Sequence, residues 1–528
     1  MASGRTSARS IATDGLVNRL RFLALTNGRP VWDLLQRVRP VRRRVNAVLI
    51  DHAIREMPPR PEPLSTMAGY TSWASLTDRT YNGRHLPPVD VPEGHRPTPE
   101  RAADLFTRGE TMIPCPRSTV LFAYFAQWFT DGFLRGDSNV PRDPRRNTSN
   151  HHIDLNQLYG LNATATAALR TFEGGLLKSR LVNGGEFPPL LCENGKIKLE
   201  FAPLGVIRFE ELTDAQRGTL FATGSDRGNT QIGFTMMTVL FLREHNRVAR
   251  LLARHHPRWD DERLFQTTRN ILIVLLVKLV AEEYINHITP YHFRFTLDPK
   301  LSTMLARAPW HRENWVTVEF NLVYRWHSLI PSHLFVGGHD LPMARTLFAS
   351  SLISDAGLGR LFEDASLQRA GRIGLFNTDP VLREVDVSSV AESRALGLAS
   401  YNSYREHCRL PAVRRFEQVT SDKRVAGALR ELYRGVDDLD LYVGLFAEEP
   451  GCRDAILPPL LTKIIAIDAF SQALTNPLLA PRVFNAATFS PYGLGVIAST
   501  RTLSDMLHRN TPEDPAPRFV SMSRRTRP

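Results

Sequence analysis

The stretch EFNLVYRWHSLIP, residues 319–331, is the part of the sequence around which the rest is organised. Apolar side chains recur in it at helical spacing until Pro331 ends the pattern, which predicts a buried helix. Tyr324 and His327 stand three residues apart, so they would share one face of that helix. A buried imidazole beside a buried phenol is found where an iron ligand has a radical-forming neighbour, and also where two polar side chains are simply satisfied in a large core. The spacing alone favours the second interpretation.

The net charge of the chain is concentrated at its two ends. The 528 residues carry a formal charge of +12, and 42% of them are hydrophobic and 23% charged, as in a soluble globular protein with one large core or two ordinary ones. Residues 1–60 hold twelve arginines against four carboxylates, and residues 518–528 add four arginines, so residues 61–517 are neutral overall. We therefore expect contact with an anionic membrane surface and no nucleic-acid partner.

Cysteine usage and hydropathy bear on the compartment. The four cysteines are scattered without a CxxC motif, which is typical of a reducing compartment. The N-terminus shows no apolar core followed by a small-residue cleavage site, so no signal peptide is evident. The most apolar run, residues 271–281, contains Lys278 and is too short to span a bilayer. These features predict a protein that is cytoplasmic, or peripheral on the cytoplasmic face of the membrane, without a transmembrane helix.

The pattern divides the chain into four parts. Residues 1–15 are expected to be disordered, and residues 16–60 form a basic amphipathic segment in short helical pieces. Such a segment can lie in a membrane interface or dock as an ordinary surface helix, and the sequence leaves both open. Residues 61–515 are expected to form one large domain, and residues 516–528 a basic disordered tail.

The predicted fold class is mainly α. Long helical patterns cover residues 232–254 and 261–287, and residues 351–480 remain mostly helical between prolines and glycines. No internal repeat, Walker loop, GxGxxG or GxSxG motif occurs.

A further helix, predicted over residues 118–134 with Ser118 as its N-cap, is apolar all round, which marks it as buried. Gln127 and Asp131 are its strongly polar interior residues, and their spacing places them on one face. A buried, unpaired carboxylate is costly, so Asp131 needs a partner or a chemical role. The alternative is that the helix frays into water at Asp131, just before Gly132.

Motifs in one collinear order extend from about residue 45 to residue 495. They are Tyr70-Thr71-Ser72-Trp73, Phe125 to Thr130, Ile153-Asp154-Leu155, Leu158-Tyr159-Gly160, Leu242 to Arg247, Leu264 to Arg269, Glu319 to His327, Tyr401 to Arg405, Asn476-Pro477 and Thr488-Phe489. Together they resemble the animal-type haem peroxidase superfamily, and most closely its prostaglandin-endoperoxide synthase (cyclooxygenase) branch. The EGF-like module of the animal enzymes has no counterpart, which agrees with the low cysteine count.

The resemblance implies a haem-dependent dioxygenase that oxygenates polyunsaturated fatty acids with molecular oxygen. Haem b would lie between the helix of Gln127 and the stretch of Tyr324, with residues 61–515 as the catalytic domain. His327 matches the axial ligand of the haem iron, and Trp326 lies beside it in the cofactor site. Tyr324 matches the tyrosine that the oxidised haem converts to a radical, because a phenol needs a strong oxidant close by.

The resemblance also suggests residues for the substrate. Arg55 falls, with a one-residue gap, near the family's carboxylate-binding arginine, or is one more basic residue of the amphipathic segment. Tyr291 matches the tyrosine that accompanies that arginine. Ser471 lies near the family's acetylatable serine, although Ala469 could occupy that position instead. Relatives dimerise, so a homodimer is possible, but the missing EGF-like module removes part of the surface that they use.

The main departure from the family is at Asp131, which replaces the distal histidine. Arg227, in the run Gly224 to Arg227, matches the distal arginine of the secreted peroxidases. An Asp131–Arg227 pair could split a peroxide, which gives a second interpretation: a haem peroxidase, or a lipid-hydroperoxide isomerase or peroxygenase. Aspartate is a weaker base than histidine near neutral pH, so peroxidase turnover is less certain. Gly132 replaces a carboxylate of the calcium-binding relatives, so no calcium is predicted.

Overall fold

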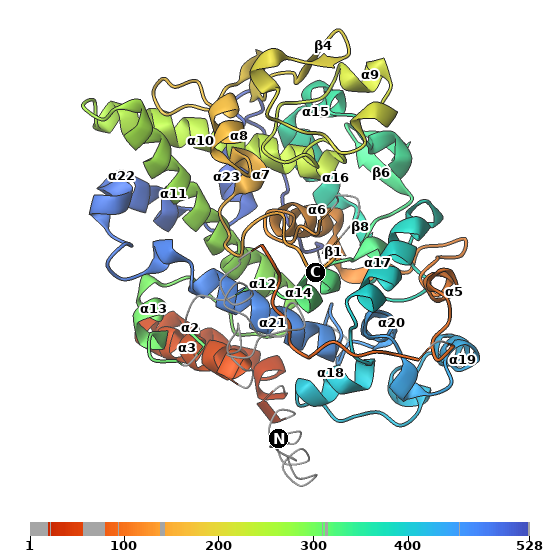
Figure 1. Ribbon diagram of the computed structural model, residues 1–528. Helices are drawn as coiled ribbons and strands as arrows, with labels where there is room; N and C mark the ends of the chain where they lie inside the picture. The colour runs from red at the N-terminus through yellow and green to blue at the C-terminus, as the bar shows by residue number, and fades with distance from the viewer. Residues whose placement is uncertain are drawn as a thin grey trace.

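The computed structural model describes residues 20–525, except 22, 56–79, 93, 138–142, 309, 312–314 and 453–454. The motif at residues 70–73 and the N-terminal residues 1–15 lie outside the described part. The expected mainly α fold is confirmed, since α-helices form most of the regular structure (Figure 1). The strands described are short and form four two-stranded sheets, β1–β8, β2–β3, β4–β5 and β6–β7.

The helices and strands pack around a single large hydrophobic core. The α-helices are α2 (Arg29–Arg37), α3 (Arg39–Arg55), α5 (Pro99–Asp104), α6 (Val120–Thr130), α7 (Asn156–Tyr159), α8 (Ala163–Leu169), α9 (Asp214–Arg217), α10 (Ile232–His255), α11 (Asp261–Leu279), α12 (Ile285–Ile288), α13 (Pro299–Leu305), α14 (Val318–Val323), α15 (Ser351–Ala356), α16 (Leu358–Leu367), α17 (Arg383–Ala395), α18 (Tyr401–His407), α19 (Lys423–Leu432), α20 (Leu441–Ala447), α21 (Pro459–Leu474), α22 (Ala486–Ser499) and α23 (Leu503–Asn510). The strands are β1 (Pro114–Thr119), β2 (Arg180–Val182), β3 (Gly185–Phe187), β4 (Cys192–Glu193), β5 (Lys196–Ile197), β6 (His333–Val336), β7 (His339–Pro342) and β8 (Arg369–Gly371).

Two groups of helices surround the centre of the molecule, where α6 and α14 lie (Figure 1). Helix α10 packs against α6, α11 and α23, and α11 packs against α22. On the other side, α14 contacts α21 and α20, and α21 packs against α3. A five-residue π-helix, Val280–Tyr284, joins α11 to α12. The predicted helices over residues 232–254 and 261–287 are therefore present, the second one with this π segment inside it.

The prediction of one helix over residues 319–331 is wrong. Helix α14 ends at Val323, and Tyr324 leaves the helical region with φ −90° and ψ 16°. Trp326 follows in a non-helical conformation, and a 3₁₀ turn begins at His327. The break lets the indole of Trp326 stack on Phe122, with ring centroids 5.7 Å apart. Tertiary contact thus overrides the helical pattern, and Tyr324 and His327 do not share a helix face.

The predicted helix over residues 118–134 is shorter than expected. Residues Pro114–Thr119 form β1, which pairs antiparallel with β8, so Thr119 rather than Ser118 is the N-cap of α6. Pairing with β8 keeps this segment extended up to Thr119.

The prediction of a disordered tail is also wrong for residues 516–525. Met522 is buried, and its carbonyl accepts a hydrogen bond of 2.9 Å from the Thr119 N–H. The Arg518 guanidinium pairs with Glu363 at 2.8 Å and with Asp514 at 3.0 Å. A distant carboxylate and a local one therefore neutralise a charge that looks unpaired in the sequence.

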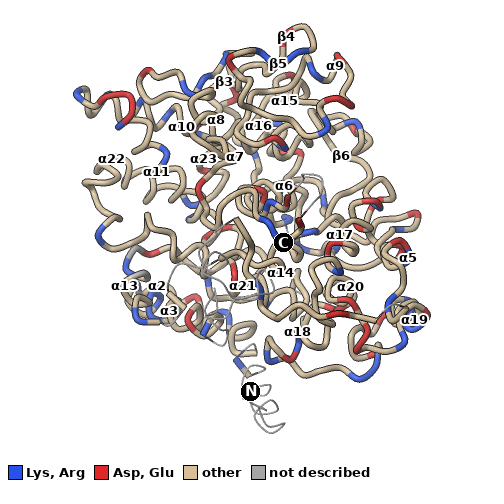
Figure 2. Tube along the Cα trace, in the orientation of Figure 1, with Lys and Arg blue, Asp and Glu red and all other residues tan. Residues whose placement is uncertain are grey.

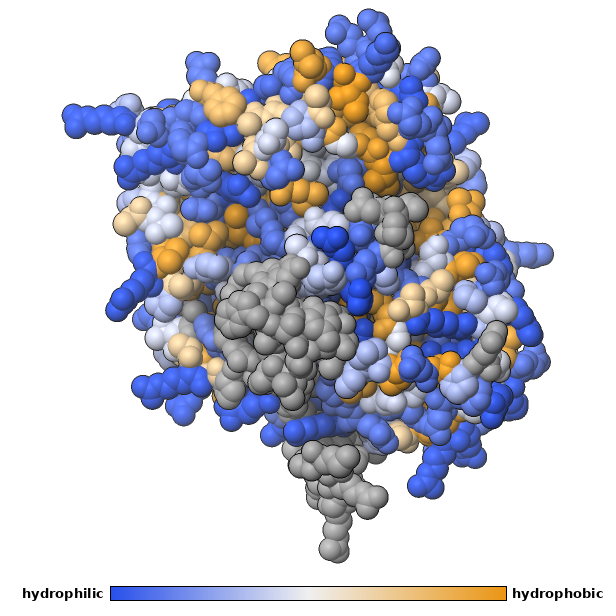
Figure 3. Space-filling model, viewed as in Figure 1, coloured by the Kyte–Doolittle hydropathy of each residue, from blue (hydrophilic) through white to orange (hydrophobic). Residues whose placement is uncertain are grey.

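The N-terminal helices α2 and α3 combine basic and exposed apolar residues. Arginines gather along both helices in Figure 2, and Figure 3 shows a visible face that is mostly hydrophilic. One face of α3 is buried against the domain, but large apolar side chains remain exposed on the two helices and at the junction between them, namely Val31, Leu34, Val38 and Val48. Within the residues described, no helix has the length and apolar character needed to cross a membrane.

Candidate active site

Gln127 is the exposed residue of a helix whose other residues are all buried. The side chain of Gln127 is therefore open at one point of an otherwise buried helix. The Gln231 side chain, at the N-cap of α10, donates a hydrogen bond of 3.0 Å from its Nε2 to Gln127 Oε1. The two amides thus lie side by side where α6 is open.

Asp131 and Arg227 meet one turn further along α6, as the sequence predicts. Arg227 Nη1 donates to Asp131 Oδ1 at 3.1 Å, while Asp131 Oδ2 is buried and has no partner among the described residues. The Asp131 carboxylate holds the pKa of Arg227 above its ordinary value, and this effect outweighs the burial of the guanidinium. The Arg227 side chain remains 34% exposed, so part of the guanidinium side chain stays accessible.

Nearby polar contacts fix the loop that carries Arg227. The Arg227 N–H donates to Ser225 Oγ at 3.2 Å, and Arg135 pairs with Asp226 at 2.7 Å. The guanidinium is therefore held by its backbone as well as by its carboxylate partner.

His327 lies on the 3₁₀ turn after α14 with its two nitrogens in different surroundings. Nδ1 donates a hydrogen bond of 2.8 Å to Asp386 Oδ1, whereas Nε2 has no hydrogen-bond partner among the described residues. The side chain is 20% exposed, so the ring is not fully enclosed. An imidazole whose Nδ1–H is held by a carboxylate presents the Nε2 lone pair, which is the arrangement of a metal ligand.

Tyr324, three residues before this histidine in the sequence, lies in an aromatic cluster. Its hydroxyl is buried, and burial raises its pKa well above the ordinary value. Its ring stacks on Trp326 at 4.9 Å, and the indole in turn stacks on Phe122 of α6. Tyr284, from the π segment, interacts with the Tyr324 hydroxyl, and its own pKa is raised by burial and by that neighbour. The phenol is therefore kept protonated and shielded from solvent.

Two sets of residues fit the two faces of a haem: Asp131 and Arg227 on one face, and His327 on the other. His327 could hold the haem iron through its Nε2, and the buried Asp131 Oδ2 has no partner among the described residues. Arg227 interacts electrostatically with Glu392 of α17, the helix that also carries Asp386. Arg227 and α17 therefore lie near enough to interact through their charges.

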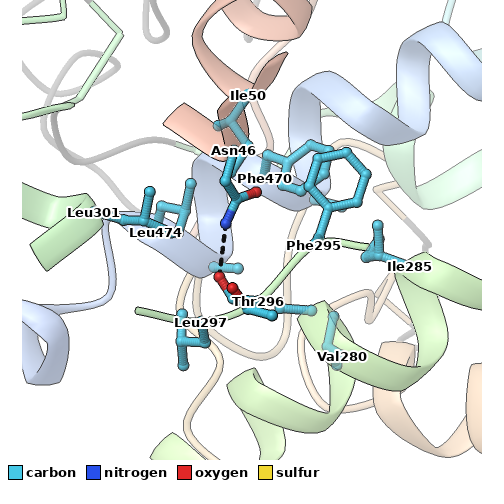
Figure 4. A pocket seen from close by; sticks show the side chains of 13 residues that line it. Asn46, Ile50, Val280, Ile285, Phe295, Thr296, Leu297, Leu301, Phe470 and Leu474 are labelled. Carbon is cyan, nitrogen blue, oxygen red and sulfur yellow. Dashed lines mark hydrogen bonds between the residues drawn. The ribbon is translucent and has the colours of Figure 1, made fainter. Parts of the chain in front are cut away.

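An apolar cavity lies where α3, the π segment and α21 meet (Figure 4). Its volume is about 20 Å³, which is enough for one water molecule. Asn46 Nδ2 donates to the Thr296 carbonyl at 2.8 Å, and Asn46 Oδ1 is buried without a partner among the described residues. The cavity is lined by Asn46, Ile50, Val280, Ala281, Ile285, Phe295, Thr296, Leu297, Leu301, Ala469, Phe470, Ala473 and Leu474.

Of the two alternatives on α21, Ala469 lines this cavity and Ser471 does not. The Ser471 hydroxyl donates to the Ile467 carbonyl at 2.7 Å, within its own helix. Arg55, at the end of α3, is 64% exposed and pairs with Asp51 at 2.6 Å. Tyr291 follows α12 and is largely buried, which raises its pKa.

Sequence reasoning missed three contributors to the site. Asp386 is 59 residues from His327, and Tyr442, whose hydroxyl donates to Asp386 Oδ1 at 3.2 Å, is on another helix. Gln231 is the third. No local pattern marks these residues, since each acts only through its contact with a residue distant in the sequence.

Near Gly132 the structure offers little to a cation. The Gly132 carbonyl accepts hydrogen bonds from Ser149 Oγ, at 2.7 Å, and from Asn156 Nδ2. Within the described ranges, no group of three or more His, Cys, Asp or Glu side chains could hold a metal ion.

Comparison with known proteins identifies the family of this chain. The model of the animal haem peroxidase family matches residues 97–520. Prostaglandin G/H synthase 2 of Equus caballus is 31% identical over 504 residues, and prostaglandin G/H synthase 1 of Mus musculus is 33% identical over 503 residues. Each alignment covers 92% of this chain and 80% of the relative.

Solved structures share the fold at lower identity. The fatty acid alpha-dioxygenase of Oryza sativa superposes with a TM-score of 0.68 and 20% identity, covering 82% of this chain and 81% of that chain. Peroxidase A of Dictyostelium discoideum superposes with a TM-score of 0.65 and 20% identity, covering 84% and 96%. Membership in the family implies haem iron as the cofactor. With a family match over residues 97–520 and relatives more than 30% identical over most of its length, this chain belongs to the animal haem peroxidases and is an oxidoreductase.

Proposed function

We propose that this protein is a haem-dependent dioxygenase that oxygenates polyunsaturated fatty acids through a radical on Tyr324. The observation that carries the proposal is Tyr324 itself. Its hydroxyl is buried, its ring stacks on Trp326, and it precedes His327 by three residues. The similarity to prostaglandin G/H synthases, and a fold shared with fatty acid alpha-dioxygenases, support a lipid substrate.

The cofactor that we propose is haem b, with His327 as its axial ligand and Trp326 beside it. When bound, haem supplies the one-electron oxidant that a phenol needs. We propose no calcium ion at Gly132, because its carbonyl is already engaged by Ser149 and Asn156.

The chemistry of the chain itself rests on Tyr324. Its phenoxyl radical takes a hydrogen atom from a bis-allylic carbon and becomes a phenol again. Molecular oxygen adds to the resulting carbon radical. The peroxyl product takes the hydrogen atom back from Tyr324, which completes a hydroperoxide and restores the radical. Burial excludes water and competing reductants from the phenol, so that the radical meets the bound lipid.

The acyl chain is proposed to occupy the apolar cavity of Figure 4, next to Ala469. Because the cavity is small, α3 and α21 must separate locally for a chain to enter. Arg55 and Tyr291 are the proposed contacts of the carboxylate, and Ser471 is a weaker candidate because its hydroxyl stays within α21. Binding of a carboxylate by Arg55 would compete with Asp51, its present partner.

The test is oxygen uptake by the haem-loaded protein with a panel of unsaturated fatty acids, followed by mass spectrometry of the products. We expect uptake by the parent protein and none by Tyr324→Phe. The matched control is Tyr159→Phe, a buried tyrosine whose hydroxyl bonds His245 at 2.8 Å. Equal rates in the parent and Tyr324→Phe would show that the radical role is wrong.

A second candidate function is favoured by the Asp131–Arg227 pair. A carboxylate with one free oxygen can hold a proton of a peroxide, while the partly exposed guanidinium stabilises the departing oxyanion. This arrangement supports a peroxidase, or a lipid-hydroperoxide isomerase or peroxygenase, aided by the amide of Gln127. It predicts consumption of lipid hydroperoxide under argon, and an Asp131→Ala protein that consumes it at the parent rate would refute the proposal.

We also propose that α2 and α3 bind an anionic membrane surface. Exposed Val31 and Leu34 beside the arginines of α2 give a face that is both apolar and basic. Leu34→Glu should reduce sedimentation with anionic vesicles, and high salt should do the same. Binding that is indifferent to both changes would count against this surface.

A further inference from the structure

The Asp386 carboxylate is buried directly behind the proposed iron ligand. Its side chain is 1% exposed, and Oδ1 accepts the His327 Nδ1–H at 2.8 Å. Since this inference concerns the haem site, it rests on the role of His327 in the proposed function. We propose that Asp386 is a positioning residue that gives His327 anionic character and thereby lowers the reduction potential of a haem iron held there.

Few groups other than His327 bind the Asp386 carboxylate. Tyr442 donates a single hydrogen bond of 3.2 Å to the same oxygen, and Oδ2 is buried without a partner among the described residues. The nearby Arg325 is directed elsewhere, because its guanidinium binds Glu392 at 2.9 Å and Ser389 at 3.2 Å. Within the described part of the chain, Asp386 forms no ion pair with a lysine or arginine. The imidazole N–H is therefore the main group that stabilises this carboxylate, and the hydrogen bond is charge-assisted.

The other face of the site differs in this respect. There the charge of Asp131 is matched by Arg227, with atoms 3.1 Å apart. Asp386 has no such counter-ion among the described residues, so its negative charge acts mainly on the imidazole of His327. A carboxylate bonded to a metal-bound histidine raises the basicity of that ligand, and a more electron-rich ligand favours the higher oxidation state of the iron.

The test compares the Fe(III)/Fe(II) midpoint potential of the haem-loaded protein and its variants, without any fatty acid. Asp386→Asn keeps an acceptor for the Nδ1–H but removes the charge, so we expect a positive shift. A tenfold weaker preference for Fe(III) corresponds to about 59 mV for one electron. Tyr442→Phe removes a donor from the carboxylate, which makes it a stronger acceptor, so the shift should be negative. The iron–imidazole stretching frequency should fall in Asp386→Asn.

The matched control is Asp440→Asn. Asp440 is also buried and also accepts a tyrosine hydroxyl, from Tyr433 at 2.7 Å, but it binds Arg394 and has no contact with His327. We expect a less stable protein with an unchanged potential. A general loosening of the fold would move the potentials of all variants in one direction, whereas opposite signs for Asp386→Asn and Tyr442→Phe support the inference.

Failure of the inference and failure of the proposed function give different results. If the parent fails to bind haem, or if His327→Ala keeps the parent Soret band, the axial-ligand role is wrong. If haem binds through His327 but Asp386→Asn leaves the potential unchanged or lowers it, the role of Asp386 is wrong. Should Asp386→Asn fail to fold, the Tyr442→Phe potential decides, and a shift of zero or of positive sign overturns the inference.

Discussion

Glu283 should make this protein less stable as the pH rises through 7. The residue lies in the π segment, and its Oε2 accepts the N–H of Leu503 at 2.7 Å. Burial raises the pKa of Glu283 from 4.5 to about 7, and the nearby Asp505 adds to the shift while the Leu503 N–H opposes it. Because the folded pKa lies above the unfolded one, the fold favours the protonated carboxyl. Its stabilising contribution is complete below pH 4.5 and is lost as pH rises through 7.

The magnitude follows from the size of the shift. One pKa unit corresponds to about 1.4 kcal/mol, and allowing for the partial exposure of Glu283 we expect an effect of about 2 kcal/mol. Glu283→Gln replaces the carboxyl by a neutral side chain of the same shape that can still accept the Leu503 N–H.

The assay is urea unfolding of the parent and of Glu283→Gln at pH 5 and at pH 8. We expect the free energy of unfolding of the variant, relative to the parent, to rise by about 2 kcal/mol between the two pH values. A difference that is the same at both pH values, or that falls at pH 8, would refute the reasoning.

Three further predictions concern stability. Phe122→Ala removes the ring on which Trp326 stacks and should lower the free energy of unfolding by about 3–5 kcal/mol in urea; a loss below 1 kcal/mol would contradict it. Although burial opposes the shift, hydrogen bonds from two arginines lower the pKa of Glu244. Glu244→Gln should therefore lower the free energy of unfolding by about 3 kcal/mol at pH 7, and by less as pH falls below 4.5. A loss that is the same at every pH would contradict this prediction. Met522→Ala should lower the unfolding free energy by about 2–4 kcal/mol by the same assay, and no loss would mean that residues 516–525 do not support the core.

The parts of the fold that the sequence predicts well are those in which local pattern and tertiary contact agree. Helix α10 was expected over residues 232–254 and is found over Ile232–His255, because most of its residues are buried and nothing interrupts the hydrogen-bond ladder. The pairing of Asp131 with Arg227 was also predictable, although only from the resemblance to a family, since 96 residues separate them.

The parts that could not be predicted depend on contacts between distant residues. The chain leaves α14 at Tyr324 because Trp326 finds a partner in Phe122, about 200 residues earlier, and no local pattern records that choice. Asp386 looks like any acidic residue of an amphipathic helix until His327 is placed beside it. Arg518 appears to belong to a basic tail until Glu363, 155 residues earlier, is seen to bind it.

The contact between Thr119 and Met522 has a consequence for the order of assembly. Thr119 caps the helix that carries Gln127 and Asp131, and its N–H and hydroxyl bind the carbonyls of Met522 and Ser521, about 400 residues later in the chain. The start of this helix therefore lacks its final partners until the ribosome has made residue 522. Contacts of such long range are slow to form. Nascent chains should complete the start of α6 only after synthesis of this last segment, and until then the buried face of α6 is a surface that a chaperone can recognise.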